Sequence, residues 1–198
     1  MKGLGTALIT PFTEEGKVDF PALSQLIEHQ VAGGTDYLVI LGTTSEVPTL
    51  THQEQNAIID YVVKQVAGRM PLVLGIGGNS TAAVVERIDE LKEQLVAHFE
   101  AILSVTPYYN RPQQEGLYLH FCEVAKASPV PVILYNVPKR TGVNLLPETT
   151  RRIYDAYPSK IMGIKEACNS VEQFTETVNI ANGDFAVISG DDDLAYEM

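Results

Sequence analysis

Lys165 stands inside an apolar stretch, IMGIKEA, at residues 161–167. Its neighbours Ile161, Met162 and Ile164 predict a strand too apolar for a wet surface. A charged amine is costly there unless it is paired or neutral. At the ordinary lysine pKa of about 10.4, roughly one amine in two or three thousand is neutral at pH 7. Burial lowers that pKa, and the neutral amine attacks carbonyls. The segment therefore favours Schiff-base chemistry at Lys165.

Other residues capable of chemistry follow the ends of further predicted strands. They lie in the segments GTTSE (42–46), TPYYNRP (106–112), YNVPKRTG (135–142) and SGDDD (189–193). A single lysine just beyond a strand usually reaches water, and threonines, tyrosines or an arginine at turns are individually ordinary. Because side chains alternate along a strand, Glu166 and Ile164 are expected to point away from the side that Lys165 takes. The joint occurrence of these groups at several strand ends favours an active site.

The elements that position these residues alternate in type. Seven nearly continuous apolar runs, typical of parallel strands covered on both faces, mostly start about 30 residues apart, the length of a βα unit. The runs lie at residues 4–12, 36–43, 70–77, 100–108, 130–138, 160–167 and 184–191. Helical patterns are found at 19–33, 51–68 and 79–96. The second of them opens with a Thr51–Glu54 capping box and is expected to stop at Gly68.

This order predicts an α/β protein with a parallel sheet, either doubly wound or closed into a barrel. The turn GIGGNS, residues 75–80, fails the dinucleotide pattern G-x-G-x-x-G at Ser80, and no P-loop is present. We favour the (β/α)8 TIM barrel, because such barrels carry their sites at the carboxyl ends of the strands. Nothing marks a linker, so residues 1–198 are expected to form a single domain.

Composition argues against several classes of function. The net charge of −11, from 14 basic and 25 acidic side chains, makes nucleic acid and an anionic membrane surface poor partners. Cys122 and Cys168 form no Cys-x-x-Cys pair and predict reduced thiols in a cytoplasmic protein. No run reaches transmembrane length. The N-terminal residues are interpreted as a first strand and not as a signal peptide.

No metal or cofactor is expected. A metal-dependent aldolase would need clustered histidines and carboxylates, but the histidines are scattered over predicted helices without ligand spacing. They are His29, His52, His98 and His120. A pyridoxal phosphate enzyme also uses a lysine, but no phosphate cradle is evident.

Five segments, GTTSE, TPYYNRPQQEGLY, YNVPKRTG, GIKEA and SGDD, together resemble the dihydrodipicolinate synthase / N-acetylneuraminate lyase family. The resemblance implies a class I, Schiff-base lyase on a (β/α)8 barrel. The activity it implies is condensation of pyruvate with L-aspartate 4-semialdehyde, on the route to diaminopimelate and lysine. Another pyruvate-dependent aldolase of the family, such as N-acetylneuraminate lyase, and a catalytically dead scaffold are the alternatives. GTTSE fits the synthases better than the lyase motif GSTGE, although Ser45 replaces the usual glycine of both.

The resemblance also implies roles for single residues. Lys165 would form the imine with pyruvate, and Tyr135 would relay protons over it. Thr43 would link Tyr135 to Tyr109, which in the family reaches in from a neighbouring subunit. Thr43 and Thr44 would bind the pyruvate carboxylate. Hydroxyls, an amine and a proton relay are what a small keto acid requires.

Two further residues complete the implied substrate pocket. Arg140 would bind the carboxylate of aspartate semialdehyde at the pocket mouth, since a guanidinium suits planar carboxylates. The carbonyl of Gly190 would face the substrate. Arg140 in a surface ion pair is the ordinary alternative.

The resemblance implies a weak regulatory site for L-lysine as well. The family's pocket at the dimer interface matches His52, Asn79 and Tyr108. Its acidic residue matches Ala83, and residues 47–48 replace smaller or polar ones. A lysine ligand would lose a charge-assisted hydrogen bond, worth about 1.5–3 kcal/mol, so feedback inhibition is expected to be weak.

The family's barrel has eight strands and a C-terminal helical region that helps build a homotetramer, a dimer of dimers. Seven strands are evident here, so the chain is expected to be an incomplete barrel, truncated after the seventh strand. We expect residues 4–9 and 185–189 not to pair. We also expect the 198-residue chain alone to be poorly stable or inactive.

Overall fold

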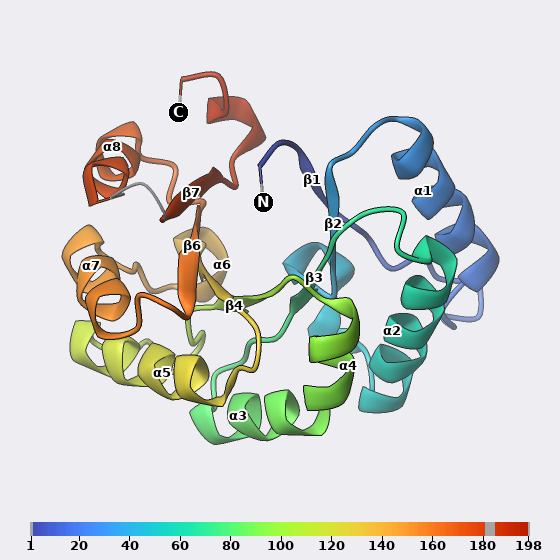
Figure 1. The fold of residues 1–198 in the computed structure, drawn as a ribbon, viewed down its shortest axis with the longest axis horizontal. Helices are drawn as coiled ribbons and strands as arrows, with labels where there is room; N and C mark the ends of the chain where they lie inside the picture. Colours follow the sequence, from blue (N-terminus) through green and yellow to red (C-terminus); the bar gives the residue numbers. More distant parts are fainter. Residues whose placement is uncertain (1, 181–184, 198) are drawn as a thin grey trace. The chain divides into compact units, whose positions relative to one another are not determined.

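The computed structural model describes residues 2–180 and 185–197 (Figure 1). The chain packs as two compact units. Unit 1 comprises the residues up to Gly75 together with Val96–Glu100, and unit 2 comprises Ile76–Leu95 and the residues from Ala101 onwards. No helix in the described part of the chain is long and apolar enough to cross a membrane. The single domain over residues 1–198 stays a prediction.

Unit 1 contains three parallel strands in chain order. Tyr37 pairs with Gly5, and Leu38 with Leu72. The central strand is buried along its whole length, as its continuous apolar run predicts. The elements are β1 (Gly5–Ala7), α1 (Phe20–Ala32), β2 (Tyr37–Ile40), η1 (Thr43–Ser45), η2 (Val47–Thr49), α2 (His52–Val66) and β3 (Leu72–Gly75).

Helix α2 begins at the predicted capping box, with the Thr51 hydroxyl accepting from the Glu54 N–H and the Glu54 carboxylate accepting from the Thr51 N–H. The helix ends one residue earlier than predicted. Ala67 already takes the left-handed conformation, at φ 48°, and Gly68 follows at φ 74°. The chain thus reverses over two residues instead of on the glycine alone.

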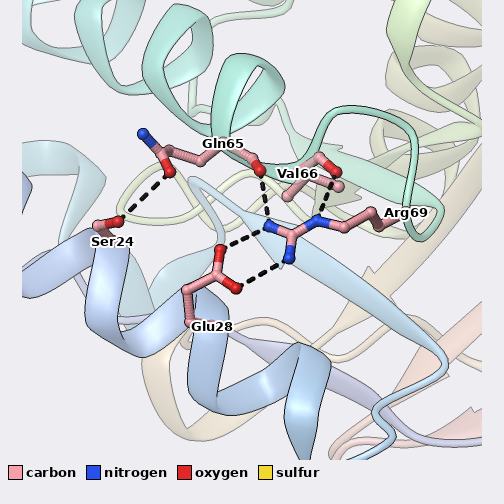
Figure 2. A network of polar contacts seen from close by, with 5 residues as sticks. All are labelled: Ser24, Glu28, Gln65, Val66 and Arg69. Carbon is pink, nitrogen blue, oxygen red and sulfur yellow. Dashed lines mark hydrogen bonds and ion pairs between the residues drawn. The ribbon is translucent and has the colours of Figure 1, made fainter.

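Arg69, just beyond α2, joins this helix to α1 (Figure 2). Its guanidinium makes a two-pronged ion pair with Glu28 of α1, at 2.6 and 2.8 Å. It also donates to the carbonyls of Gln65 and Val66, at 2.7 and 3.1 Å. Those carbonyls belong to the last turn of α2 and have no partner within the helix. Arg69 therefore caps one helix while it holds the other.

Unit 2 contains four parallel strands, again in chain order. Its helices form a layer in which α5 packs against α3 and α7, and α7 packs against α8 (Figure 1). The elements are α3 (Thr81–Glu90), α4 (Lys92–His98, whose last three residues belong to unit 1), β4 (Ala101–Val105), α5 (Gln114–Ala127), β5 (Val132–Asn136), α6 (Pro138–Thr141), α7 (Pro147–Ala156), β6 (Ile161–Glu166), α8 (Val171–Ile180), β7 (Ala186–Ser189) and η3 (Asp192–Leu194).

The structure also differs from the sequence expectation in the third helical segment. Residues 79–96 form two helices, α3 and α4, because the backbone leaves the helical conformation at Leu91, with ψ 7°. The predicted apolar residues are still buried on both sides of this break: Val84, Ile88, Leu91 and Leu95. The apolar spacing therefore predicts which residues are buried, but it does not predict that the helix axis changes direction at Leu91.

Parallel strands alternating with helices confirm the α/β class. Asp184, the first residue of the predicted seventh strand, lies outside the described residues. The expected lack of pairing between residues 4–9 and 185–189 concerns two different units and stays a prediction.

Candidate active site

Lys165 and Tyr135 lie directly opposite each other on neighbouring strands. They are register partners in the parallel β5–β6 pair, so their side chains leave the sheet on the same face. The Lys165 Nζ lies 4.8 Å from the centre of the Tyr135 ring. Tyr135 is buried, with 7% of its surface exposed, and Lys165 is half-buried. The Lys165 amine and the Tyr135 phenol thus lie close together on the same face of the sheet.

The surroundings of Lys165 tune its charge in two directions. Burial lowers the pKa of this amine below its usual 10.5, and this is the largest influence on it. The carboxylates of Asp192 and Asp191, which follow β7, act against burial and raise the pKa. The balance leaves the pKa lowered. More of the amine is therefore neutral at pH 7 than in an exposed lysine, which is what nucleophilic attack on a ketone requires.

Gly190 provides the space in which the Lys165 side chain lies. A Cβ at this position would be 2.9 Å from the Lys165 Cε and 2.9 Å from the Ala167 Cβ. The Gly190 N–H donates to the Glu166 carbonyl at 2.8 Å, which ties the end of β7 to the end of β6. Lys165, Tyr135 and Gly190 are therefore brought together by the structure of unit 2.

The other candidate residues of unit 2 lie on the segments that follow β4 and β5. Arg140 is an exposed residue of the short helix α6. Tyr109 is 86% exposed and has a left-handed backbone at φ 68°, while the preceding Tyr108 is half-buried. The Asn110 amide donates to the carbonyl of Asn79 at 2.7 Å, which anchors this loop before α3.

Thr43 and Thr44 lie in unit 1, in the turn after β2. Thr43 is half-buried and Thr44 is exposed. Ser45 is buried, its hydroxyl donates to the Leu8 carbonyl at 2.6 Å, and its own carbonyl accepts from the Thr10 hydroxyl at 2.8 Å. Ser45 is not among the residues with positive φ in this turn. The turn thus accommodates serine in place of the usual glycine and uses its hydroxyl as a tie to the end of β1.

The residues matched to the regulatory pocket lie on separate segments. His52 is an exposed residue at the start of α2 in unit 1. Asn79 and Tyr108 are half-buried residues of unit 2. Their regulatory role stays a prediction, as does the approach of Tyr109 to Thr43.

The described residues contain no group of three or more histidine, cysteine, aspartate or glutamate side chains placed to hold a metal ion. The histidines lie on four different helices: His29 on α1, His52 on α2, His98 on α4 and His120 on α5. His120 is buried, which lowers its pKa to about 4, and its Nδ1 lies 2.8 Å from the Thr81 hydroxyl. Its surroundings are those of a neutral core histidine.

Sequence reasoning missed a polar cluster behind Lys165 and Tyr135. Asn136 and Glu166 are both fully buried, and the Asn136 amide donates to the Glu166 carboxylate at 2.8 Å. Asn144 and Gln173 join them through further hydrogen bonds. The signal was present in the sequence, because a glutamate and an asparagine each directly follow a candidate catalytic residue inside an apolar strand.

A family model described as the dihydrodipicolinate synthetase family matches residues 1–198. The chain therefore belongs to this family. It is 49% identical, over 198 residues, to the 4-hydroxy-tetrahydrodipicolinate synthase of Parabacteroides distasonis, and the match covers 100% of this chain and 65% of that protein. The chain thus spans 65% of the length of that relative, slightly less than two-thirds.

Two solved structures share the fold of this chain. The chloride-inhibited dihydrodipicolinate synthase of Acinetobacter baumannii, complexed with pyruvate, is 40% identical with a TM-score of 0.92, over 98% of this chain and 65% of that one. A 2-keto 3-deoxygluconate aldolase from Picrophilus torridus is 28% identical with a TM-score of 0.89, over 98% and 68%. The predicted fold class, a TIM barrel of which the described residues form seven strands, is confirmed.

Proposed function

We propose that the protein is a lyase that condenses pyruvate with L-aspartate 4-semialdehyde through an imine on Lys165, in the biosynthesis of diaminopimelate and lysine. The observation that carries the proposal is the half-buried Lys165 amine, lowered in pKa, opposite the buried ring of Tyr135. Membership of the family and identity to a named synthase support it. The protein is expected to act in the cytoplasm.

The chemistry follows from these two groups. The neutral amine attacks C2 of pyruvate, and loss of the carbonyl oxygen as water gives the protonated imine. Removal of a C3 proton gives an enamine, whose C3 attacks the aldehyde carbon of the second substrate. The amino group of that substrate then attacks C2 and releases Lys165. Tyr135 is suited to the proton transfers, because a phenol can both donate and accept a proton.

Substrate binding is proposed from the residues matched to the family. Thr43 and Thr44 would hold the pyruvate carboxylate, and the Gly190 carbonyl would face the substrate. Arg140 would bind the second carboxylate, a role supported by its exposure on the segment that follows Tyr135. Tyr109 would complete the site of a neighbouring subunit within a homo-oligomer.

The same fold also supports a related activity. The likeness to a 2-keto 3-deoxygluconate aldolase at a TM-score of 0.89 shows that the fold alone does not select the second substrate. The sequence GTTSE favours the synthase over a lyase that acts on N-acetylneuraminate. A homologue that serves only as a scaffold would contain the lysine but form no imine.

Borohydride reduction in the presence of pyruvate tests the proposal. Reduction should add the mass of a reduced pyruvate imine to the peptide that contains Lys165, and the variant Lys165→Ala should lose this addition completely. Lys160→Ala is the matched control, because Lys160 lies just before the same strand but donates to the Ser128 carbonyl at 2.7 Å. Peptide mass spectrometry reads the result.

Each outcome is decisive. An addition to any lysine other than Lys165 rejects the assigned nucleophile, and no addition favours the scaffold. Once trapping is established, the rate of pyruvate consumption with L-aspartate 4-semialdehyde, compared with N-acetylmannosamine, selects the second substrate.

A further inference from the structure

A closed set of hydrogen bonds joins β5, β6, helix α8 and the segment before α7. Asn136 donates to the Glu166 Oε1 at 2.8 Å and to the Asn144 Oδ1 at 2.7 Å, and it accepts from the Leu145 N–H at 2.9 Å. Gln173 of α8 donates to the Glu166 Oε2 at 3.2 Å. Asn144 donates to the Gln173 Oε1 at 2.8 Å. We call Asn136, Asn144, Glu166 and Gln173 the rear cluster.

The rear cluster lies directly behind the proposed catalytic pair. Asn136 and Glu166 are register partners, one residue beyond Tyr135 and Lys165. Because successive side chains leave a strand on opposite faces, the two pairs lie back to back across the same two strands. A change in the orientation of one strand end therefore moves both pairs together.

The donors and acceptors of the rear cluster are matched in only one set of side-chain orientations. Both hydrogens of the Asn136 amide are used, and its oxygen is occupied by Leu145. Both Glu166 oxygens accept from amides, so a neutral amide in its place would face a donor on each side. Turning Gln173 over would break its bond from Asn144. Two buried N–H donors that face each other leave both without an acceptor, which costs free energy. The side chains of the cluster therefore resist reorientation.

We propose that Glu166 and Asn136 are positioning residues, which hold the ends of β5 and β6 so that the Lys165 amine stays enclosed opposite Tyr135. This inference rests on the proposed function, in which Lys165 is the nucleophile. Neither residue touches the substrate. They act through the backbone that they share with the catalytic pair.

Two variants test the proposal. Glu166→Gln places a donor against Asn136 or Gln173, and Gln173→Leu removes one donor from Glu166 at a half-buried position. We expect the rate of borohydride-trapped imine formation to fall about tenfold in Glu166→Gln and about threefold in Gln173→Leu, since small misplacements of a reacting group carry such costs. Thermal unfolding confirms that each variant is folded.

The pH profile of Lys165 acetylation by acetic anhydride, measured against Lys126, gives a readout independent of pyruvate. If the ends of β5 and β6 loosen, water reaches the Lys165 amine and favours its charged form. The pH midpoint of its acetylation then moves up towards that of an ordinary lysine. Loss of the Glu166 charge alone would move it down, because an anion favours the charged amine. The other ionisable groups around the amine, Tyr135, Asp191 and Asp192, are unchanged in both variants.

Thr81→Val is the matched control, because it removes a different buried polar contact of unit 2, the one to His120. It should leave both readouts of Lys165 at wild-type values. An upward midpoint with slower trapping supports the inference. A wild-type or downward midpoint in folded Gln173→Leu overturns it, and so does trapping at the wild-type rate. Failure of the unaltered protein to trap pyruvate rejects the proposed function instead, while the acetylation midpoints still decide the positioning role.

Discussion

The Lys165 amine is set between two opposing influences, burial and the carboxylates that follow β7. Removing an anion should tip this balance. In Asp192→Asn the pKa of Lys165 falls further, so the neutral fraction at pH 7 rises. Exposed charge pairs are worth about 0.2–1 kcal/mol, equivalent to about a 1.4- to 5-fold faster imine formation. Trapping rates measured between pH 6 and pH 10 should show the midpoint moving to lower pH.

The neighbouring carboxylate offers a control for this effect. Asp193 is exposed like Asp192 but is not among the groups that influence the Lys165 pKa. Asp193→Asn should leave the profile unchanged. A midpoint that moves equally in both variants would mean that only the general negative charge of the protein acts on the amine.

A second prediction concerns the space beside the amine. In Gly190→Ala the new Cβ would lie 2.9 Å from the Lys165 Cε, so the lysine side chain must move away from its place opposite Tyr135. We expect imine formation to fall about tenfold. Gly78→Ala is the control, because its Cβ would meet only the Val84 side chain, at an ordinary 3.4 Å. Equal trapping rates in the two variants would contradict the prediction.

At this scale the sequence was informative where a residue contradicted its surroundings. A lysine in an apolar strand demands an explanation, and the structure places it half-buried beside Tyr135. Glu166 was expected only to point away from Lys165. Its hydrogen-bond partners Gln173 and Asn136 are 7 and 30 positions distant, so the sequence signals a buried carboxylate but not the residues that pair with it. For the same reason the hydrogen bonds of Ser45 could not be predicted.

Among the elements, the α1–α2 pair depends on a guanidinium at a helix end. Arg69→Lys keeps the charge but loses the two-pronged geometry and most of the contacts to the carbonyls of Gln65 and Val66 (Figure 2). We expect a lower thermal unfolding midpoint, little improved over Arg69→Gln. Differential scanning calorimetry measures both. An unfolding midpoint of Arg69→Lys equal to that of the unaltered protein would show that only the positive charge at position 69 matters.

The same ion pair gives a pH dependence with a defined sign. Arg69 lowers the pKa of Glu28 below 4.5 in the folded state. The stabilisation is therefore present above pH 4.5 and is lost as the pH falls through the lowered pKa. The gap between the unfolding midpoints of the unaltered protein and Arg69→Gln should narrow in that range, and also at high salt.

The strands and the first two helices were predictable, because short-range chemistry defines their ends, whereas no helix was predicted for α5, α6, α7 or α8. The Thr51–Glu54 capping box is where the sequence predicts it, and the helix predicted from residue 19 has Asp19 as its N-cap. The division at Leu91 was not predictable, since the apolar spacing runs through it unbroken. Periodicity reports which residues face the core, but it does not report where the helix axis changes direction.

For the whole molecule, the exposed Tyr109 leads to a prediction about assembly. A tyrosine with 86% of its surface in solvent and a left-handed backbone gains little within its own chain. If it completes the site of a partner, Lys165→Ala and Tyr109→Phe subunits should complement each other when mixed. In a two-fold dimer, the mixed pair has one intact site, so about a quarter of all sites should recover at equal mixing.

Pyruvate trapping in the mixture, compared with each variant alone, measures this recovery. Native mass spectrometry, which separates the mixed dimer from the two parent dimers by mass, confirms that subunits have exchanged. No recovery in exchanged dimers would place Tyr109 outside the partner's site. Barrel closure and the assembly of the family were expectations from resemblance, and neither follows from the local chemistry of single strands.

The pairing register of β5 and β6 limits how the gene can diverge. Loss of one codon within Ile161–Ile164 would turn every later residue of β6 to the opposite face. The amine of Lys165 would then enter the layer where Gln173 meets the strand, and the carboxyl of Glu166 would take its place opposite Tyr135. The nucleophile opposite Tyr135 and the positioning contact of Glu166 would both be lost, although neither side chain is itself replaced. This strand can therefore evolve by substitution but not by loss of a residue.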